Sequence, residues 1–194
     1  AIPHEGVARL DVVPEEYHDY LWGLYEASFA ELQEKTPTLQ LMHEDDFRKS
    51  LTDPRVTKMF SFTDGRPETM LIYSSIKLSP EYYPWNSVPY FEKNFQEDFA
   101  ADRIYYFVGL FTDPEYQNRG NFIRLVEPLF RDVMERDPLG ARFIYDCCED
   151  NAWLAQVLHS LAERHQSGIP DERAWRVAEL AQLGTQTYYD IDMK

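Results

Sequence analysis

Residues 103–135 contain three consecutive patterns, RIYYFVGLFT (103–112), DPEYQ (113–117) and NRGNFIRLVEPLFRDVME (118–135). The first pattern is rich in β-branched and aromatic residues and predicts a strand. The last has apolar residues at steps of three and four and predicts a helix. The first turn of a helix exposes backbone N–H groups that have no partner in the helix and carry a partial positive charge. The chain is therefore expected to form a strand, a turn and a helix whose junction can bind an anion.

The turn at this junction contains residues that suit a phosphate. Gly120 allows the backbone to approach a phosphate closely, and Arg119 or Arg124 can add positive charge. Pro114 and Gly120 would also suit a turn with a purely structural role. The turn alone leaves both interpretations open.

The other elements are expected on both sides of this junction. Their ranges are 6–13, 56–62, 68–75, 141–147, 176–183 and 185–192 for strands, and 14–33, 44–51 and 151–164 for helices. Residues 78–102 combine prolines with large aromatic side chains and predict a packed loop with a short helix. This loop either covers an acceptor site or only closes the core. The length of 194 residues and the lack of an internal repeat predict a single α/β domain over residues 1–194.

Charge and composition argue against several classes of partner. The 34 acidic and 19 basic residues give a net charge of -15, which repels phosphates, so we expect no nucleic acid partner. No run of about 18 apolar residues is present, so we expect no membrane partner. Residues 1–10 lack the pattern of a secretory leader, and we expect a cytoplasmic protein. The acidic surface either concentrates a cationic substrate or is only a solvated face.

The histidines and cysteines have simple interpretations. His159 and His165 are six residues apart and lie on different faces of a helix, and no His-Glu-x-x-His motif occurs, so we expect no metal. The adjacent Cys147 and Cys148 would form a disulfide only with strain and do not suggest an oxidising compartment. Cysteine can also act as a nucleophile, but no partner base is evident, and we interpret both as buried strand residues.

The junction resembles the signature of the GNAT superfamily of N-acyltransferases, which is Gln or Arg, two residues, Gly, one residue, then Gly or Ala. Gln117, Gly120 and Phe122 occupy the three positions, and Phe122 replaces the usual small residue. The strand at 143–146, followed by Asn151 at the start of a helix, is similar to the family's next strand and its pantetheine-binding Asn. The resemblance is strong from residue 103 to about residue 161.

This resemblance implies a mixed, mostly antiparallel sheet of six to seven strands, flanked by about four helices and splayed between the fourth and fifth strands. An acyl-CoA, the expected co-substrate, would insert its pantetheine arm into the splay. The N–H of Phe111 or Thr112 would polarise the thioester carbonyl. The residues that the resemblance assigns to the acyl-CoA are Phe111, Thr112, Gln117, Asn118, Arg119, Gly120, Asn121, Phe122 and Asn151.

The resemblance also implies an activity. A member of this family moves an acetyl or other short acyl group from acyl-CoA to a primary amine by direct attack in a ternary complex. The amine belongs to a small molecule, such as a polyamine, an antibiotic or an amino acid, or to a protein. The alternative is a non-catalytic acyl-CoA-binding, regulatory or interaction domain with the same fold. A homodimer is left open, and residues 82–90, 146–151 and 186–190 look similar to uncharacterised actinobacterial-type members.

The catalytic base is less clearly marked than the acyl-CoA site. The attacking amine must lose a proton, and the family often has a Glu on the strand before the phosphate turn. Here the strand at 103–111 contains no carboxylate. Asp146 on the neighbouring strand is the nearest candidate base. Its alternative role is that of a cap or a backbone partner.

The general acid also departs from the family pattern. The family usually has a Tyr seven residues after the pantetheine-binding Asn, and this chain has Leu158. The candidate substitutes are His159 and the tyrosines of the last strand, Tyr188 and Tyr189. The alternative for His159 is a partly exposed helix residue without a catalytic role.

Overall fold

A computed structural model describes residues 3–35, 40–117, 120–137, 140–148, 152–166, 176–183 and 186–193. Within these residues, seven strands form one sheet. They are β1 (Gly6–Leu10), β2 (Val56–Thr63), β3 (Arg66–Ser75), β4 (Ile104–Thr112), β5 (Arg142–Cys148), β6 (Arg176–Leu183) and β7 (Gln186–Asp192). Their order in the sheet is β1-β2-β3-β4-β5-β7-β6. The pairs are antiparallel except for β4 and β5, which are parallel, so the mixed and mostly antiparallel sheet is confirmed.

The parallel pair separates after a short contact. β4 and β5 pair at only three positions, from Ile104 opposite Arg142 to Tyr106 opposite Ile144. Beyond Tyr106, β4 stays with β3 and β5 stays with β7. The sheet is therefore splayed between its fourth and fifth strands, as expected.

A bulge in β4 lies directly beside the splay. Ile72 of β3 is opposite Gly109, while the next residue, Tyr73, is opposite Phe107, so Val108 is the extra residue. A bulge bends a strand and increases its twist. The bulge thus turns β4 at the point where β5 leaves it.

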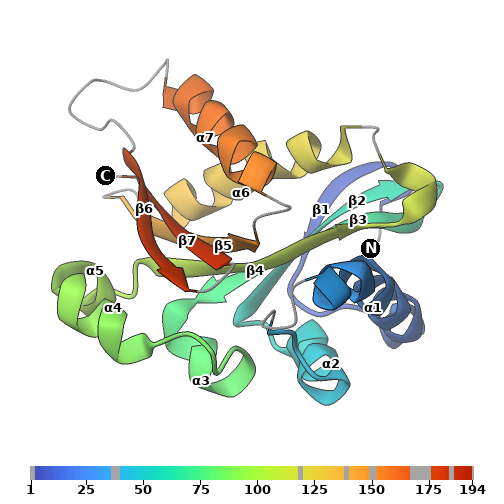
Figure 1. The fold of residues 1–194 in the computed structure, drawn as a ribbon. Helices are drawn as coiled ribbons and strands as arrows, with labels where there is room; N and C mark the ends of the chain where they lie inside the picture. Colours follow the sequence, from blue (N-terminus) through green and yellow to red (C-terminus); the bar gives the residue numbers. More distant parts are fainter. Residues whose placement is uncertain are drawn as a thin grey trace.

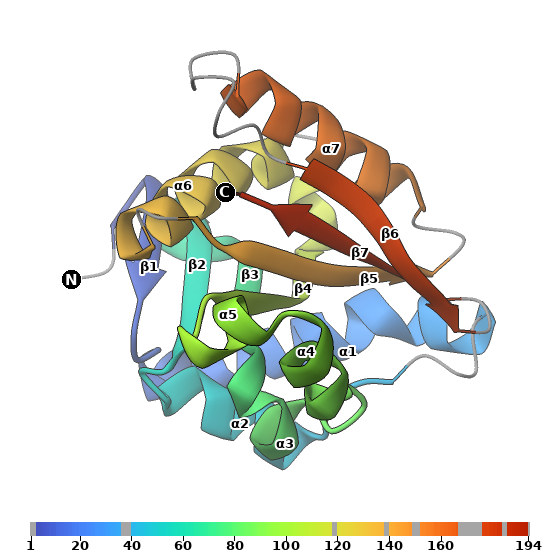
Figure 2. The ribbon, with the colours of Figure 1, turned by 90° about the vertical axis from the view of Figure 1, so that its left-hand side faces the viewer.

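Helices cover both faces of the sheet (Figures 1 and 2). Those on one face are α1 (His18–Lys35), α2 (Glu44–Thr52), α3 (Ser79–Tyr82), α4 (Val88–Asn94) and α5 (Gln96–Ala100), and those on the other face are α6 (Asn121–Arg136) and α7 (Ala152–Gln166). Because successive strand residues point to opposite faces, the sheet contributes to two buried apolar clusters. One cluster packs against α1 and α2, and the other packs against α6 and α7.

The four long helices were expected, but residues 79–100 contain more structure than the predicted loop with one short helix. Three short α-helices form there, and Pro80 and Pro89 lie in the first turns of α3 and α4, where a missing N–H does no harm. Tyr82, Tyr83 and Phe91 are buried and join the segment to the apolar cluster that packs against α1 and α2. The prolines therefore start helices here rather than prevent them.

Two element boundaries also differ from the expected ones. β1 ends at Leu10 rather than at Val13, because Val13 turns into the core and its N–H donates to the carbonyl of Leu51. α6 begins at Asn121, because Gly120 before it has a φ of 75°. Within the described residues, none of the helices combines the length and the apolar composition needed to cross a bilayer.

A buried ion cluster joins α5 to β5 and β7. Arg142 of β5 donates to Asp98 of α5 at 2.8 Å, to Asp192 at 3.0 Å and, at a shorter distance, to Asp190. The guanidinium also lies over the ring of Phe95, 4.3 Å from its centroid. Burial raises the pKa of Asp190 to about 6; Arg142 opposes this shift and the neighbouring Asp192 adds to it. The cluster therefore contains a carboxylate whose ionised form is disfavoured.

Candidate functional site

The turn after β4 is held by its own side chains. Oδ1 of Asp113 accepts a hydrogen bond from the N–H of Glu115 at 3.0 Å and so caps a 3-10 turn at Pro114–Tyr116. Nδ2 of Asn121, the first residue of α6, donates to the carbonyl of Tyr116 at 3.2 Å. No acidic residue lies in the first turn of α6. The N-terminal end of α6 is therefore fixed in place. Its first turn contains no negative side chain that would neutralise the positive end of the helix dipole.

Asp113 also connects this turn to distant parts of the chain. Its Oδ2 accepts from the hydroxyl of Tyr20 on α1 at 2.7 Å and from the guanidinium of Arg66 on β3 at 2.8 Å. The Arg66 guanidinium lies 4.9 Å from the centroid of the Tyr20 ring. Burial opposes ionisation of Asp113, but these hydrogen bonds and the positive charge of Arg66 hold the pKa of its carboxyl below the ordinary value. Asp113 is thus an ionised anchor for the turn.

An open groove begins at the turn and runs between α1 and α7. Gly120 borders it in the left-handed conformation, and a Cβ at this position would meet no atom within 4 Å. Six residues predicted to bind acyl-CoA line this single groove: Phe111, Thr112, Gln117, Gly120, Asn121 and Phe122. The other three, Asn118, Arg119 and Asn151, lie outside the described residues. The structure therefore brings the described part of the predicted acyl-CoA site together.

The groove continues into a cavity of about 90 Å³ at the splay. Phe29, Leu32, Leu110 and Leu154 line both spaces, so the groove and the cavity adjoin. Further lining residues come from α1, the segment before α2, the Trp85 loop, β4 and β5: Tyr25, Gln40, Leu41, Trp85, Tyr106, Phe107, Val108, Gly109, Asp146 and Cys147. The cavity thus lies directly against the bulge of β4.

Asp146 reaches this cavity from β5 as the end of a hydrogen-bonded chain. The indole N–H of Trp85 donates to the hydroxyl of Tyr106 at 3.1 Å, and that hydroxyl donates to Oδ1 of Asp146 at 2.6 Å. Burial raises the pKa of Asp146, and the hydrogen bond from Tyr106 opposes this shift. A carboxylate with a raised pKa is a stronger base than an exposed one. Asp146 therefore has the position and the chemistry to accept a proton from a molecule in the cavity.

His159 lies on the opposite face of the sheet from Asp146. Its Nε2 is 2.8 Å from the hydroxyl of Tyr145, and the rings of Tyr145 and Tyr189 stack with centroids 5.2 Å apart. Tyr145 precedes Asp146 in the strand, so their side chains point to opposite faces. The structure does not bring His159 or Tyr189 into the cavity lining.

The other candidates for the general acid are placed only in part. Tyr188 is opposite Asp146 in the register of β5 and β7, and its side chain lies outside the described part of the structure. Leu158, at the position of the family's Tyr, is buried in the core between α7 and the sheet.

Cys147 is buried, as expected, and contributes to the same core.

The predicted N–H donors lie at the end of β4. Phe111 is opposite Met70 and Thr112 is opposite Thr69 in the ladder with β3. On the other edge of β4, no strand among the described residues pairs beyond Tyr106. The N–H of Asp113 donates to the carbonyl of Glu68 at 2.8 Å, so alternation directs the N–H of Phe111 to β3 and that of Thr112 to the open edge. Of the two predicted donors, only Thr112 therefore presents its N–H to the splay.

Several lining residues were not predicted from the sequence. Tyr25 and Phe29 belong to the apolar stripe of α1, which was interpreted only as core. The hydroxyl of Tyr25 accepts from the N–H of Met42 at 3.0 Å and so holds the segment of Leu41 against the cavity. A Cβ on Gly109 would lie 3.3 Å from Cζ of Phe29, so this glycine permits the close approach of α1 to the bulge. The number of aromatic residues on the α1 stripe is the sequence feature that could have indicated these lining residues.

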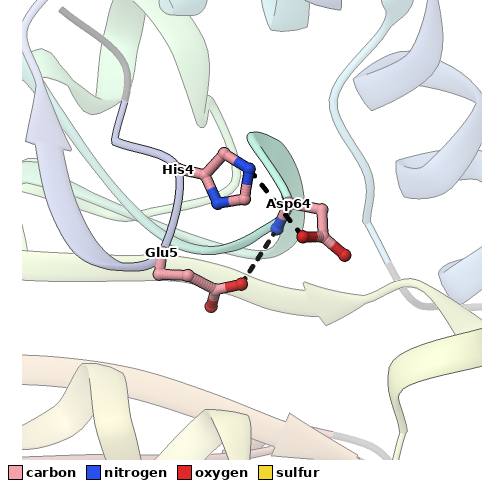
Figure 3. A group of neighbouring side chains, drawn as sticks. All are labelled: His4, Glu5 and Asp64. Carbon is pink, nitrogen blue, oxygen red and sulfur yellow. Dashed lines mark hydrogen bonds and ion pairs between the residues drawn. The ribbon is translucent and has the colours of Figure 1, made fainter.

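A separate group of potential metal ligands lies at the start of the chain. Within the described residues, His4, Glu5 and Asp64 have ligand atoms within 4.8 Å of one another, and all three are exposed (Figure 3). Nε2 of His4 is 3.8 Å from Oδ1 of Asp64, and Glu5 accepts from the Asp64 N–H at 3.2 Å. These contacts attach the N-terminal segment to the β2–β3 turn and explain why the three side chains lie together.

Comparisons with known proteins identify the fold. No protein-family model matches this chain, and no curated sequence matches it. Similar solved structures include an acetyltransferase of the GNAT family from Listeria monocytogenes, at 11% identity and a TM-score of 0.58, covering 96% of this chain and 94% of that chain. The ribosomal-protein-S18-alanine N-acetyltransferase from Escherichia coli has 11% identity and a TM-score of 0.54, with the same coverage of 96% and 94%. AAC(6')-Ib in complex with paromomycin and acetyl-CoA has 11% identity, a TM-score of 0.58 and coverage of 98% and 94%. The chain therefore has the fold of GNAT acetyltransferases.

Proposed function

We propose that this chain is an acyl-CoA-dependent N-acetyltransferase that moves an acetyl or other short acyl group to a primary amine. One observation carries the proposal. The groove at the Gly120 turn adjoins, at the splay of β4 and β5, a cavity that Asp146 lines. The GNAT fold and neighbours solved with acetyl-CoA or coenzyme A support the same conclusion.

In this proposal the acyl-CoA occupies the groove. The pyrophosphate binds at Gln117 to Phe122, where helix α6 presents N–H groups and its positive dipole end. Asn151 contacts the pantetheine arm. The thioester reaches the bulge of β4, and the N–H of Thr112, which the register with β3 directs to the open edge, polarises its carbonyl.

The amine attacks the thioester directly. Its nitrogen forms a bond to the carbonyl carbon, the carbon–sulfur bond breaks, and the amine proton passes to Asp146. The sulfur leaves as a thiolate and takes up a proton. A thiol has a pKa of about 8.5, so coenzyme A is an adequate leaving group even without a strong acid. Tyr188 is the proposed general acid. His159 is the alternative, and its position on the opposite face of β5 makes it the weaker candidate.

The site can be tested by titrating the protein with acetyl-CoA and with coenzyme A in a calorimeter. Gly120→Asp and Gly120→Asn are a matched pair, because both side chains tolerate a positive φ better than most and enter the same open space. They differ by one negative charge. We expect Gly120→Asp to bind acetyl-CoA at least about 10-fold more weakly than Gly120→Asn. Equal affinity of the two variants would contradict binding of the pyrophosphate at this turn.

A second candidate function is acyl-CoA binding without catalysis. It is favoured by the buried Leu158 in place of the family's Tyr and by the lack of a carboxylate on β4. Release of free thiol from acetyl-CoA, measured with and without amines, separates the two functions. Binding with no amine-dependent thiol release would establish the second candidate.

A further inference from the structure

The lining of the cavity at Asp146 has an unusual distribution of polar groups. Among its described lining residues, Asp146 is the only charged side chain, and aromatic and aliphatic side chains form most of the wall. The phenolic and indole groups are turned toward protein partners. Tyr25 accepts from Met42, and Tyr106 bonds to both Trp85 and Asp146. Gln40 and the open backbone edge of β4 add polar groups to the lining, and the remaining wall presents apolar and ring surface around one carboxylate.

This combination suits one kind of acceptor. An ammonium group is attracted to a carboxylate and to the faces of aromatic rings, most strongly to Trp. We infer that the acceptor is a small primary amine with a compact apolar body, with the nitrogen at Asp146 and beside the ring of Trp85 and the carbon body against Phe29. This inference rests on the proposed function, since it assigns the acceptor of that same site.

The same lining disfavours the other acceptors. An amino acid would bring its own carboxylate into a cavity that already contains one. An aminoglycoside would bring more hydroxyl groups than Gln40 and the open edge of β4 can satisfy, and the others would lose their hydration without gaining partners. The cavity volume of about 90 Å³ also favours a small body. A protein lysine has an apolar stem but carries peptide groups close behind it.

Turnover of a panel of amines tests the inference. The apolar members are phenethylamine and isoamylamine, and the comparison members are ethanolamine, glutamate, kanamycin and a lysine-containing peptide. We expect kcat/KM to be at least about 10-fold higher for the apolar members, because a hydrophobic pocket discriminates by roughly this factor for each methylene group it contacts. A preference for any comparison member would overturn the inference.

A second measurement tests the rings directly and does not require acetyl transfer. Phenethyltrimethylammonium cannot be acetylated and cannot donate a hydrogen bond, so its binding depends on its charge and on the aromatic surface. We expect Trp85→Leu to weaken its binding about 5- to 30-fold. Trp85→Phe, which keeps a ring, retains most of the affinity. Tyr90→Leu removes an exposed aromatic side chain that does not line the cavity and is the matched control.

The two measurements distinguish failure of this inference from failure of the proposed function. Binding of acetyl-CoA together with equal turnover of apolar and polar amines overturns the inference alone. Absence of acetyl-CoA binding overturns the proposed function, while ring-dependent binding of the trimethylammonium probe would still support the cavity as an ammonium site. If Trp85→Leu folds and binds the probe as tightly as the wild type, the ring of Trp85 does not contribute to ammonium binding, and the inference is overturned.

Discussion

The hydroxyl of Tyr106 on β4 donates a 2.6 Å hydrogen bond to Oδ1 of Asp146 on β5, at the point where the two strands separate. The bond joins the two sides of the opening and leaves the second carboxylate oxygen for another partner. It also stabilises the ionised form of an acid that burial would otherwise keep protonated.

Replacing Asp146 should remove the base. We expect Asp146→Asn to lower kcat by about 10²- to 10⁴-fold while acetyl-CoA still binds. In the wild type, activity requires the ionised carboxylate, so it is lost as the pH falls through the raised pKa of Asp146. Tyr106→Phe removes the hydrogen bond that lowers this pKa, so the acidic limb of the kcat/KM profile should move to higher pH. Nearly full activity of Asp146→Asn would mean that another group takes the proton.

Loss of the Asp113 anchor should weaken acyl-CoA binding rather than amine binding. Asp113→Ala removes the cap of the turn and the bonds from Tyr20 and Arg66. We expect KM for acetyl-CoA to rise about 10-fold, with a loss of about 1 kcal/mol in the free energy of unfolding. Glu115→Ala is the control, because this exposed side chain also pairs with Arg66, at 3.7 Å, but caps nothing. A larger effect on KM for the amine than for acetyl-CoA would contradict the assignment.

Gly109 should resist substitution because of its neighbour on α1. The Cβ of Gly109→Ala would lie 3.3 Å from the Phe29 ring, so α1 or the bulge must shift. We expect a loss of roughly 1–3 kcal/mol in the free energy of unfolding, measured with urea. Adding Phe29→Leu should recover part of that loss. Gly23→Ala, on α1 with nothing near its Cβ, should be neutral or stabilising by about 0.5–1 kcal/mol.

The ion cluster at Arg142 should make stability depend on pH in the acidic range. Asp190 has a pKa of about 6 in the folded protein, against an ordinary value of 3.8. Below both values it is protonated in the folded and unfolded states, and its contribution is fully present. As the pH rises from about 4 through 6, the unfolded state ionises first and the contribution is lost, by roughly 2–3 kcal/mol.

Urea unfolding of the wild type and Asp190→Asn at several pH values isolates this contribution. The difference in the free energy of unfolding between the two proteins should fall between pH 4 and 6. Asp192→Asn removes the like charge that raises the pKa of Asp190, so its transition should lie at lower pH. A difference that does not vary with pH would rule out the titration of Asp190.

The sequence predicts the sheet, the long helices and the phosphate turn because each has a local pattern. Residues 103–135 change from strand to turn to helix within a single stretch, and Gly120 occupies a position with a positive φ before the helix. Only one short helix was predicted where three form, because helices of four to seven residues are too short to show a helical repeat of apolar residues. The fold class therefore follows from the sequence, whereas the detail of residues 79–100 depends on tertiary packing.

The turn residues and Asp146 were predicted as site residues, but the contacts that join Asp146 to distant segments were not. The turn residues lie close in the sequence and line one groove, whereas the chain from Trp85 through Tyr106 to Asp146 joins three distant segments. No sequence spacing predicts such a contact. His159 illustrates the converse, because its neighbour in sequence, Leu158, is core and its partner is Tyr145 on the far face of β5. A residue that follows a site position closely in the sequence can therefore lie outside the site, when the sheet separates the two.

The brief pairing of β4 with β5 leaves an interior strand edge beside the opening, in the middle of the sheet rather than at its border. Edges at the border of a sheet attract other chains, and proteins usually protect them. An interior edge can be reached only by something slender enough to enter between two strands. Among the described strands, the incomplete ladder therefore leaves unpaired backbone groups inside the sheet, where a narrow linear ligand with amide groups, such as the proposed pantetheine arm, would find hydrogen-bond partners.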